Sequence, residues 1–323
     1  MIDDPRAKCS DADFIKLFTE IGPTEAAKTL GVTLRNVFAR RGALERLYKA
    51  PIAVPIKQNA RKIATAPHPQ RAHIEIETGT IIVGSDAHIW PGPMSTAMRG
   101  FIKFIKDMKP AAVILNGDVV DLPQISRHPP IGWTDLPTVQ QEIEAAQDIL
   151  ARIEDATFKA RKIWTLGNHD SRFETRIATV APEYAKIAGA SLRDHFPTWE
   201  PGWSCWINGD SDDGVVVKHR WKGGVHAPHN NAVNAGKHMV TGHLHSAKVS
   251  PYTNYRATTY GVDTGCLADT DAKAFVDYTE DSPKSWISAF GVLTFHKGRL
   301  LWPEIAAVVS DGVMQFRGQL IEV

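Results

Sequence analysis

Seven side chains suited to divalent metal ions occur in five short motifs of this chain. In order, the motifs are Ser85-Asp86-Ala87-His88, Gly117-Asp118-Val119-Val120-Asp121, Gly167-Asn168-His169-Asp170, Lys218-His219 and Gly242-His243-Leu244-His245. They offer two Asp, one Asn and four His, a set that suits Mn, Fe, Zn, Ni or Co rather than Ca. Seven such ligands can hold two cations that share one carboxylate. That arrangement stabilises the attacking and leaving oxygens of a phosphoryl displacement.

The spacing within and between the motifs predicts that these side chains meet. Asp86 and His88 stand two positions apart, as do His243 and His245, so each pair projects from the same side of a strand end. Each motif ends or follows an apolar run that is typical of a β-strand. In open α/β sheets the carboxyl ends of the strands form the binding crevice, so we expect one metal centre there.

The elements that must position the motifs follow an α/β pattern from residue 72 onward. Residues 73–77 alternate, Thr78-Gly79 can turn, and 80–84 are apolar, which predicts a hairpin whose second strand leads to Asp86. Helices are expected over 97–108, 139–160 and 173–187, with buried strands over 111–116 and 162–166. Shorter strands are expected over 215–217, 237–241, 256–260 and 287–295. This order predicts two mixed sheets packed as a sandwich, with helices outside.

The ordered motif set resembles the calcineurin-like metallophosphoesterase superfamily. That family's pattern is Asp-x-His, Gly-Asp-x-x-Asp, Gly-Asn-His-Asp/Glu, a single His and Gly-His-x-His, and the likeness covers about residues 80–250. It implies a four-layer αββα sandwich with a binuclear site. One metal would be held by Asp86, His88 and His245, the other by Asn168, His219 and His243, with Asp118 bridging them.

The same resemblance implies roles for the neighbouring residues. His169 would face the substrate as a general acid or charge stabiliser, oriented by Asp170, and Asp121 would hydrogen-bond behind the ligands. Two divalent ions are implied, with Mn favoured, and a metal-bridging hydroxide would attack phosphorus in line. The chain departs from the family where His219 is followed by Arg220 instead of Gly, which leaves His226 and His229 as alternatives; His219 is preferred because it directly follows the apolar run over 215–217.

The first 50 residues predict a separate all-α domain. Thr24 can cap a helix that Gly31 ends, and Thr33 can cap the next one. The stretch resembles the helix-turn-helix of phage and bacterial DNA-binding proteins. Its second helix would expose side chains that suit bases and phosphates, namely Arg35, Asn36, Arg40 and Arg41. A three-helix packing module or a protein-binding adaptor are the alternatives.

Composition separates this N-terminal part from the rest of the chain. Residues 1–62 hold 12 Lys and Arg against 7 Asp and Glu and no His, while the remainder holds 25 against 29 and all 13 His. Residues 51–70 contain four Pro with scattered basic residues, a linker composition. The expected organisation is therefore a helical domain over 1–50, a linker over 51–70 and a metallophosphoesterase domain over 71–323.

Several features favour a nucleic acid as the substrate. Arg127 and His128 follow the second motif, and Trp221, Lys222 and His226 follow His219; a Trp and a Lys in a glycine-containing loop suit single-strand binding. Together with the N-terminal domain they resemble phage or prophage DNA-repair-exonuclease-like members, so we expect a phosphodiesterase or nuclease that binds DNA. The alternatives are a phosphomonoesterase or protein phosphatase and, from another class, a DNA-binding regulator with a structural metal site.

Composition bounds the remaining possibilities. The chain has 323 residues, 43% of them hydrophobic, and no apolar run near the roughly 18 residues of a membrane span. The acidic N-terminal residues carry no secretory pattern, and the three Cys follow no metal or redox spacing. We therefore expect a cytoplasmic protein without a membrane partner. The sequence leaves its oligomeric state open.

Overall fold

The computed structural model describes residues 9–50, 52, 70–128, 132–272, 275, 279 and 282–323. The chain divides into two compact units, Met1–Ala64 and Thr65–Val323. The predicted linker over 51–70 lies outside the described residues, apart from Ile52 and Gln70. Among the described residues, no helix is both long enough and apolar enough to cross a membrane.

The N-terminal unit consists of α1 (Asp11–Leu30) and α2 (Leu34–Tyr48). Gly31, in the left-handed conformation, ends α1, and the Thr33 side chain caps α2 by accepting from the Asn36 N–H, as expected. The cap predicted at Thr24 is wrong. Gly22 breaks α1 (φ 79°) and Pro23 restarts the helix, so Gly22 holds the N-cap position.

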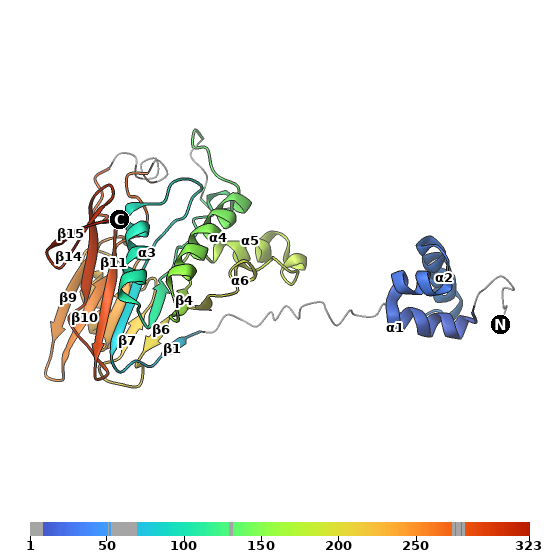
Figure 1. Cartoon of the computed structure of the whole chain (residues 1–323), viewed down its shortest axis with the longest axis horizontal. Coiled ribbons are helices and arrows are strands. Elements are labelled where there is room, and N and C mark those ends of the chain that lie inside the picture. Colours follow the sequence, from blue (N-terminus) through green and yellow to red (C-terminus); the bar gives the residue numbers. More distant parts are fainter. Residues whose placement is uncertain are drawn as a thin grey trace. The chain divides into compact units, whose positions relative to one another are not determined.

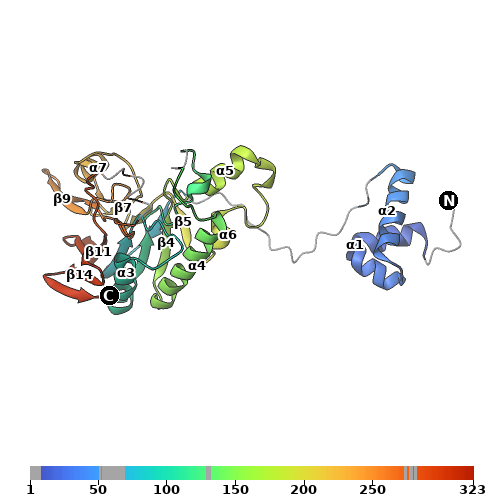
Figure 2. The same ribbon diagram turned by 90° about the horizontal axis from the view of Figure 1, so that it is seen from above.

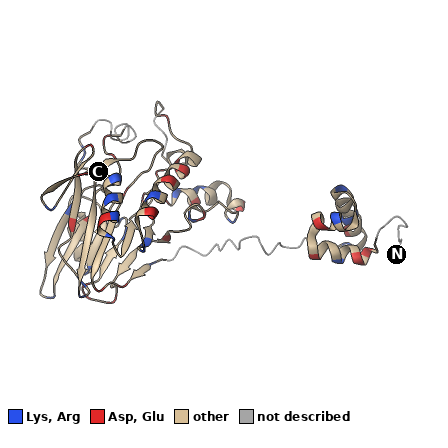
Figure 3. Ribbon diagram, viewed as in Figure 1, with Lys and Arg blue, Asp and Glu red and all other residues tan. Residues whose placement is uncertain are grey.

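The expectation that Arg40 and Arg41 are freely exposed on α2 is also wrong. Arg40 donates to the Cys9 carbonyl and the Asp11 carboxylate, each at 2.8 Å, and lies over the Phe14 ring. Arg41 pairs with Glu45 at 2.9 Å. Both guanidinium groups hold this unit together, and Arg35 and Asn36 remain exposed on the same helix. Acidic and basic side chains are mixed over both helices (Figure 3).

The larger unit contains two sheets. The six-stranded sheet has the order β1 (Ala72–Ile74), β6 (Cys205–Ile207), β7 (Val215–Val217), β8 (His238–Thr241), β10 (Thr258–Asp263), β9 (Lys248–Thr253). The nine-stranded sheet has the order β15 (Gln319–Glu322), β14 (Val313–Phe316), β13 (Glu304–Ser310), β11 (Ala289–His296), β2 (Gly79–Gly84), β3 (Ala112–Leu115), β4 (Arg161–Thr165), β5 (Glu200–Gly202), with β12 (Arg299–Leu300) beside β11. Its described helices are α3 (Thr96–Met108), α4 (Val139–Ala156), α5 (Arg172–Val180), α6 (Leu192–His195) and α7 (Ala227–Ala235), with 3-10 turns η1 (Pro123–Ile125) and η2 (Pro182–Tyr184).

Two apolar cores explain why the central strands read as continuous apolar runs. Ile81 and Val83 of β2 point into the core between the sheets, together with Val240 of β8. Ile82 points the other way, into the core beneath α3 and α4. A strand buried on both faces has no polar face to alternate. With α7 packed against β8 and β10, the layers form the predicted αββα sandwich with two mixed sheets (Figure 1, Figure 2).

The hairpin predicted over residues 73–84 is wrong. β1 pairs in parallel with β6 in the smaller sheet, whereas β2 lies between β11 and β3 in the larger one. The chain crosses from one sheet to the other between them. Alternation such as the buried–exposed–buried pattern of β1 shows that one face of a strand is buried, but it does not specify the neighbouring strand.

Candidate metal centre

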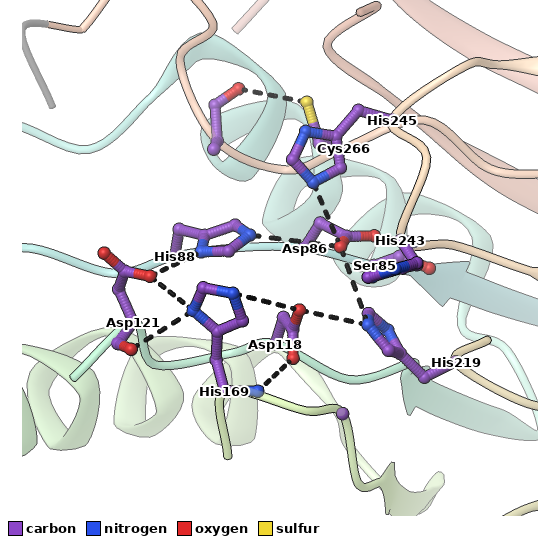
Figure 4. A network of polar contacts seen from close by, with 12 residues as sticks. Ser85, Asp86, His88, Asp118, Asp121, His169, His219, His243, His245 and Cys266 are labelled. Carbon is purple, nitrogen blue, oxygen red and sulfur yellow. Dashed lines mark hydrogen bonds and ion pairs between the residues drawn. The ribbon is translucent and has the colours of Figure 1, made fainter. Parts of the chain in front are cut away.

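The carboxyl ends of strands from both sheets carry the five motifs. β2, β3 and β4 run parallel in the larger sheet, and β7 and β8 run parallel in the smaller one. Asp86, Asp118, His169, His219 and His245 therefore come from five different strand ends, yet they point toward one another (Figure 4). This convergence is what the sequence spacing predicts.

The predicted ligands form two adjoining groups, Asp86 with His88 and His245, and Asp118 with His219 and His243. Within each group the potential ligand atoms all lie within 4.8 Å of one another. His245 Nε2 is 3.1 Å from Asp86 Oδ1, and His219 Nε2 is 3.0 Å from Asp118 Oδ2. His219 Nε2 also lies 3.9 Å from Asp86 Oδ1, so the two groups border each other.

The backbone is strained at most of these residues. Non-glycine residues in the left-handed region include Asp86 (φ 54°), His88 (40°), Asp118 (49°), His243 (70°) and His245 (55°). This conformation costs an L-residue roughly 1–2 kcal/mol. Such outliers persist where the surrounding structure holds them in place, and they cluster at functional sites.

Three motif glycines, Gly117, Gly167 and Gly242, are required because ligand side chains approach the backbone closely. A Cβ on Gly117, which has φ +81°, would lie 2.4 Å from the His219 ring. A Cβ on Gly242 would lie 2.5 Å from Asp86 Oδ2. Any larger residue at these positions would displace a predicted ligand.

Unsatisfied buried atoms indicate that the centre fits metal ions. Among the described residues, His88 Nε2 and Asn168 Oδ1 are buried and form no hydrogen bond. Buried polar atoms normally have a partner, and both belong to predicted ligands. On the opposite edge of its ring, His219 Nδ1 lies 2.8 Å from the Asn116 carbonyl oxygen. That contact leaves Nε2 directed at Asp118, as expected of a ligating imidazole.

The electrostatics of the centre also call for cations. Burial by itself would raise the pKa of Asp118, but His219 and other imidazoles outweigh burial and hold that pKa well below its ordinary value. Burial likewise would lower the pKa of His219, yet Asp86 and Asp118 raise it to about 9. Burial, together with His219, lowers the pKa of His243 to about 4. Two buried carboxylates thus remain anionic and require a balancing cation, which a divalent metal can supply in place of a proton.

The predicted partner of His169 is wrong, because Asp121 and not Asp170 contacts its ring. His169 Nδ1 is 2.5 Å from Asp121 Oδ1. The buried Asp170 carboxylate accepts instead from the N–H groups of Asp118 (2.9 Å) and Gly167 (2.8 Å) and from the Trp164 indole (3.0 Å). Asp170 therefore shapes the turn that presents Asp118.

Two residues near the centre were missed by sequence reasoning. Arg172, at the start of α5, donates from Nη1 to the Asp121 carbonyl (2.7 Å) and places Nη2 3.2 Å from His169 Nε2; no sequence signal marks it. Glu142 of α4 accepts from the Leu122 N–H at 2.7 Å and from the Asp121 N–H. Burial raises the pKa of Glu142 to about 8. A signal existed here, because Glu142 stands among the apolar positions of an amphipathic helix.

The remaining candidates lie outside the two ligand groups. His226 is exposed at the start of α7 and His229 Nδ1 faces Ser250 Oγ at 3.4 Å, so it is His219 that the structure places beside Asp118. Arg127 and His128 are exposed after η1. In the loop after His219, Trp221 is 48% exposed and Lys222 lies over its ring.

Comparison with known proteins gives matches among solved structures only. No protein-family model and no curated protein sequence matches the chain. The matching structures include Vps29 with Zn²⁺ from Entamoeba histolytica (13% identical, 75% of this chain and 98% of that chain, TM-score 0.40). They also include the phosphoesterase YfcE from E. coli (12% identical, 75% of this chain and 96% of that chain, TM-score 0.33). A third is a dimetal phosphatase from Danio rerio (10% identical, 76% of this chain and 99% of that chain, TM-score 0.37). At these identities and TM-scores the likeness says nothing about activity, so the functional conclusion rests on the side chains of the metal centre.

Proposed function

We propose that this protein is a phosphoesterase that works with two divalent metal ions. The observation that carries the proposal is the meeting of two carboxylate–imidazole groups at the strand ends of both sheets. Asp86, His88 and His245 would hold one ion, and Asn168, His219 and His243 the other, with Asp118 between them. Bound there, two such ions activate water and stabilise the charge of an in-line phosphoryl displacement. Mn is the proposed metal, and Fe, Zn, Ni and Co suit the same ligands.

His169 is the group that this chain offers to the substrate. Its backbone N–H donates to Asp118 Oδ1 at 2.8 Å, and its Nε2 lies 3.8 Å from Asp118 Oδ2. Burial lowers the pKa of His169, but Asp121 and Asp118 outweigh burial and raise it. A protonated His169 can donate to a phosphoryl oxygen or protonate the leaving oxygen. Arg172 adds a second positive charge beside it.

We further propose that the substrate is a phosphodiester in DNA or another nucleic acid. Support comes from a separate helical unit with exposed Arg35 and Asn36 and from the exposed Trp221 and Lys222 in the loop after His219. An aromatic ring and a cation suit stacking on bases and contact with phosphates. Arg127, His128 and His226 remain candidate substrate contacts.

Hydrolysis of bis-p-nitrophenyl phosphate tests the metal-dependent activity. The rate should rise with added Mn²⁺ and vanish with EDTA; equal rates in both conditions would refute the proposal. p-Nitrophenyl phosphate, tested in parallel, separates a diesterase from a phosphomonoesterase or protein phosphatase. Single- and double-stranded DNA then test the nuclease assignment. Metal binding with no hydrolysis of any ester would favour a DNA-binding regulator with a structural metal site.

A further inference from the structure

A cavity of about 240 Å³ lies directly beside His88. Its walls are mainly apolar and include Trp90, Met94, Met98, Ile149, Leu267 and Phe275. His88 belongs both to this lining and to the first ligand group. The cavity therefore borders the metal centre at His88.

The cavity walls are tied to the backbone that carries Asp86. The Leu267 N–H donates to the Ser85 carbonyl at 2.8 Å, and the Ala268 N–H donates to the Asp86 carbonyl at 3.2 Å. The Ser95 hydroxyl donates to the Leu267 carbonyl and so joins the two wall segments. These bonds fix the positions of the two wall segments relative to Asp86.

An aromatic wall runs from the ligands into the cavity. The His88 ring contacts the Phe275 ring edge-on, with centroids 5.3 Å apart. Phe275 in turn contacts Trp286, and Trp286 contacts His245 at 4.7 Å. Of these rings, His88 and Phe275 line the cavity together with Trp90, and they suit a flat apolar group.

The charges around the centre are unevenly distributed. Among its described lining residues, the cavity has Asp269 as its only carboxylate and no Lys or Arg. The neighbouring basic side chains lie outside the described lining: Lys284 lies over the Trp286 ring, 5.7 Å from its centroid, Arg172 contacts His169, and the charge of Arg220 acts on His243. An anionic group in the cavity would meet Asp269 and no cation among the described lining residues, so this lining favours an uncharged group.

We propose that this cavity binds an uncharged, ring-bearing group esterified to the phosphate at the metal centre. The proposal rests on the proposed phosphoesterase function and defines its substrate class: one arm of the ester is an aryl or nucleoside group. Nucleobase and simple aryl rings share the relevant chemistry, which is a flat apolar face.

Calorimetric titration of the Mn²⁺-loaded full chain tests the cavity without relying on turnover. Methylphosphonate and phenylphosphonate present the same head group and differ only in the ring. Phenylphosphonate should bind about 10- to 100-fold more tightly, the factor expected for burial of one apolar ring. Ile149→Trp, which fills the cavity, and Trp90→Ala, which removes a wall, should each bring the affinity ratio toward one. Ala151→Trp, on the exposed face of α4, is the matched control and should keep the ratio.

A second pair of ligands distinguishes the two sources of the ring. Thymidine 5′-monophosphate should bind more tightly than ribose 5-phosphate if the arm is a nucleoside, whereas a preference confined to phenylphosphonate points to a smaller aryl group. Equal affinities within both pairs, in a protein that hydrolyses bis-p-nitrophenyl phosphate, would overturn this inference alone. Absence of both phosphonate binding and hydrolysis would overturn the proposed function instead.

Discussion

Asp121 Oδ1 lies 2.5 Å from His169 Nδ1 and 3.2 Å from His88 Nδ1. One carboxylate thus contacts both the proposed proton donor and a proposed metal ligand. Asp121 is itself held in place, since its own N–H donates to Glu142 and its carbonyl accepts from Arg172. Burial raises the pKa of Asp121, but His169 and His88 outweigh burial and hold that pKa well below its ordinary value.

Removal of the His169 ring should slow hydrolysis without loss of metal. We expect His169→Ala to lower kcat by about 10²–10⁴-fold, the range for a positioned acid–base group, with both ions retained by elemental analysis. Asp121→Asn should lower kcat by a smaller factor. If Asp121 acts by orienting the His169 ring, adding Asp121→Asn to His169→Ala should lower kcat little further. If Asp121→Asn lowers kcat by the same factor in wild type and in His169→Ala, Asp121 acts through its other contact, His88.

Asp118→Asn should be the most damaging conservative change at the centre. It removes the negative charge next to both ligand groups while keeping the side-chain volume. We expect kcat to fall by at least about 10²–10³-fold and the metal content to drop by one ion or more per chain. Elemental analysis and the diester assay check this, with the exposed Asp148→Asn as control. Full metal content in Asp118→Asn would contradict the assignment of a shared ligand.

Gly117→Ala should weaken metal binding through a purely steric effect. The new Cβ would lie 2.4 Å from the His219 ring at a backbone φ of +81°. We expect roughly a 10–100-fold loss of metal affinity, the scale seen when residues that orient ligands change, measured by competition with a chelator. Gly223→Ala is the matched control, because nothing lies within 4 Å of its Cβ position. Equal affinities of the two variants would refute the steric argument.

The N-terminal unit should bind DNA and be dispensable for the chemistry. A chain that begins near His68 should keep its rate on a small phosphodiester and lose DNA affinity. Arg35→Ala in the full chain should weaken DNA binding. It should also reduce the slope of log affinity against log salt concentration by about one. Arg40→Ala should instead destabilise this unit, because Arg40 bonds Asp11 and Cys9. Unchanged DNA affinity in the shortened chain would favour a protein-binding adaptor.

His238 should make folding stability fall on mild acidification. It is 3% exposed, its Nδ1 accepts from the Tyr260 N–H, and burial lowers its pKa from 6.5 to about 4. Folding favours the neutral ring. The contribution of His238 to the free energy of unfolding is therefore complete above pH 6.5 and is lost as the pH falls toward 4. The loss is on the order of 3 kcal/mol. His238→Asn retains an acceptor without titrating, so urea unfolding at pH 7 and 4.5 should show a smaller difference in this variant than in wild type.

The sequence by itself determined the layered architecture and placed the predicted metal ligands at the ends of strands. Runs such as Ile81–Val83, flanked by Gly and followed by Asp or His, show both that a strand is buried and where it ends. Parallel strands of one sheet end at the same edge, so the motifs that follow β2, β3 and β4 lie together, as do those that follow β7 and β8. Cap residues such as Gly31 and Thr33 likewise act within a few residues and were predicted correctly.

Only the tertiary structure decided which partners each polar group finds. Asp121 and Asp170 occur in similar motifs, yet their contacts depend on where the turns after β3 and β4 lie in space. The same holds for the ion pair between Arg40 and Asp11 and for the placement of β1 and β2 in different sheets. Hydrogen bonds and ion pairs depend on distances of a few ångströms between segments far apart in the chain, and local sequence patterns do not encode such distances.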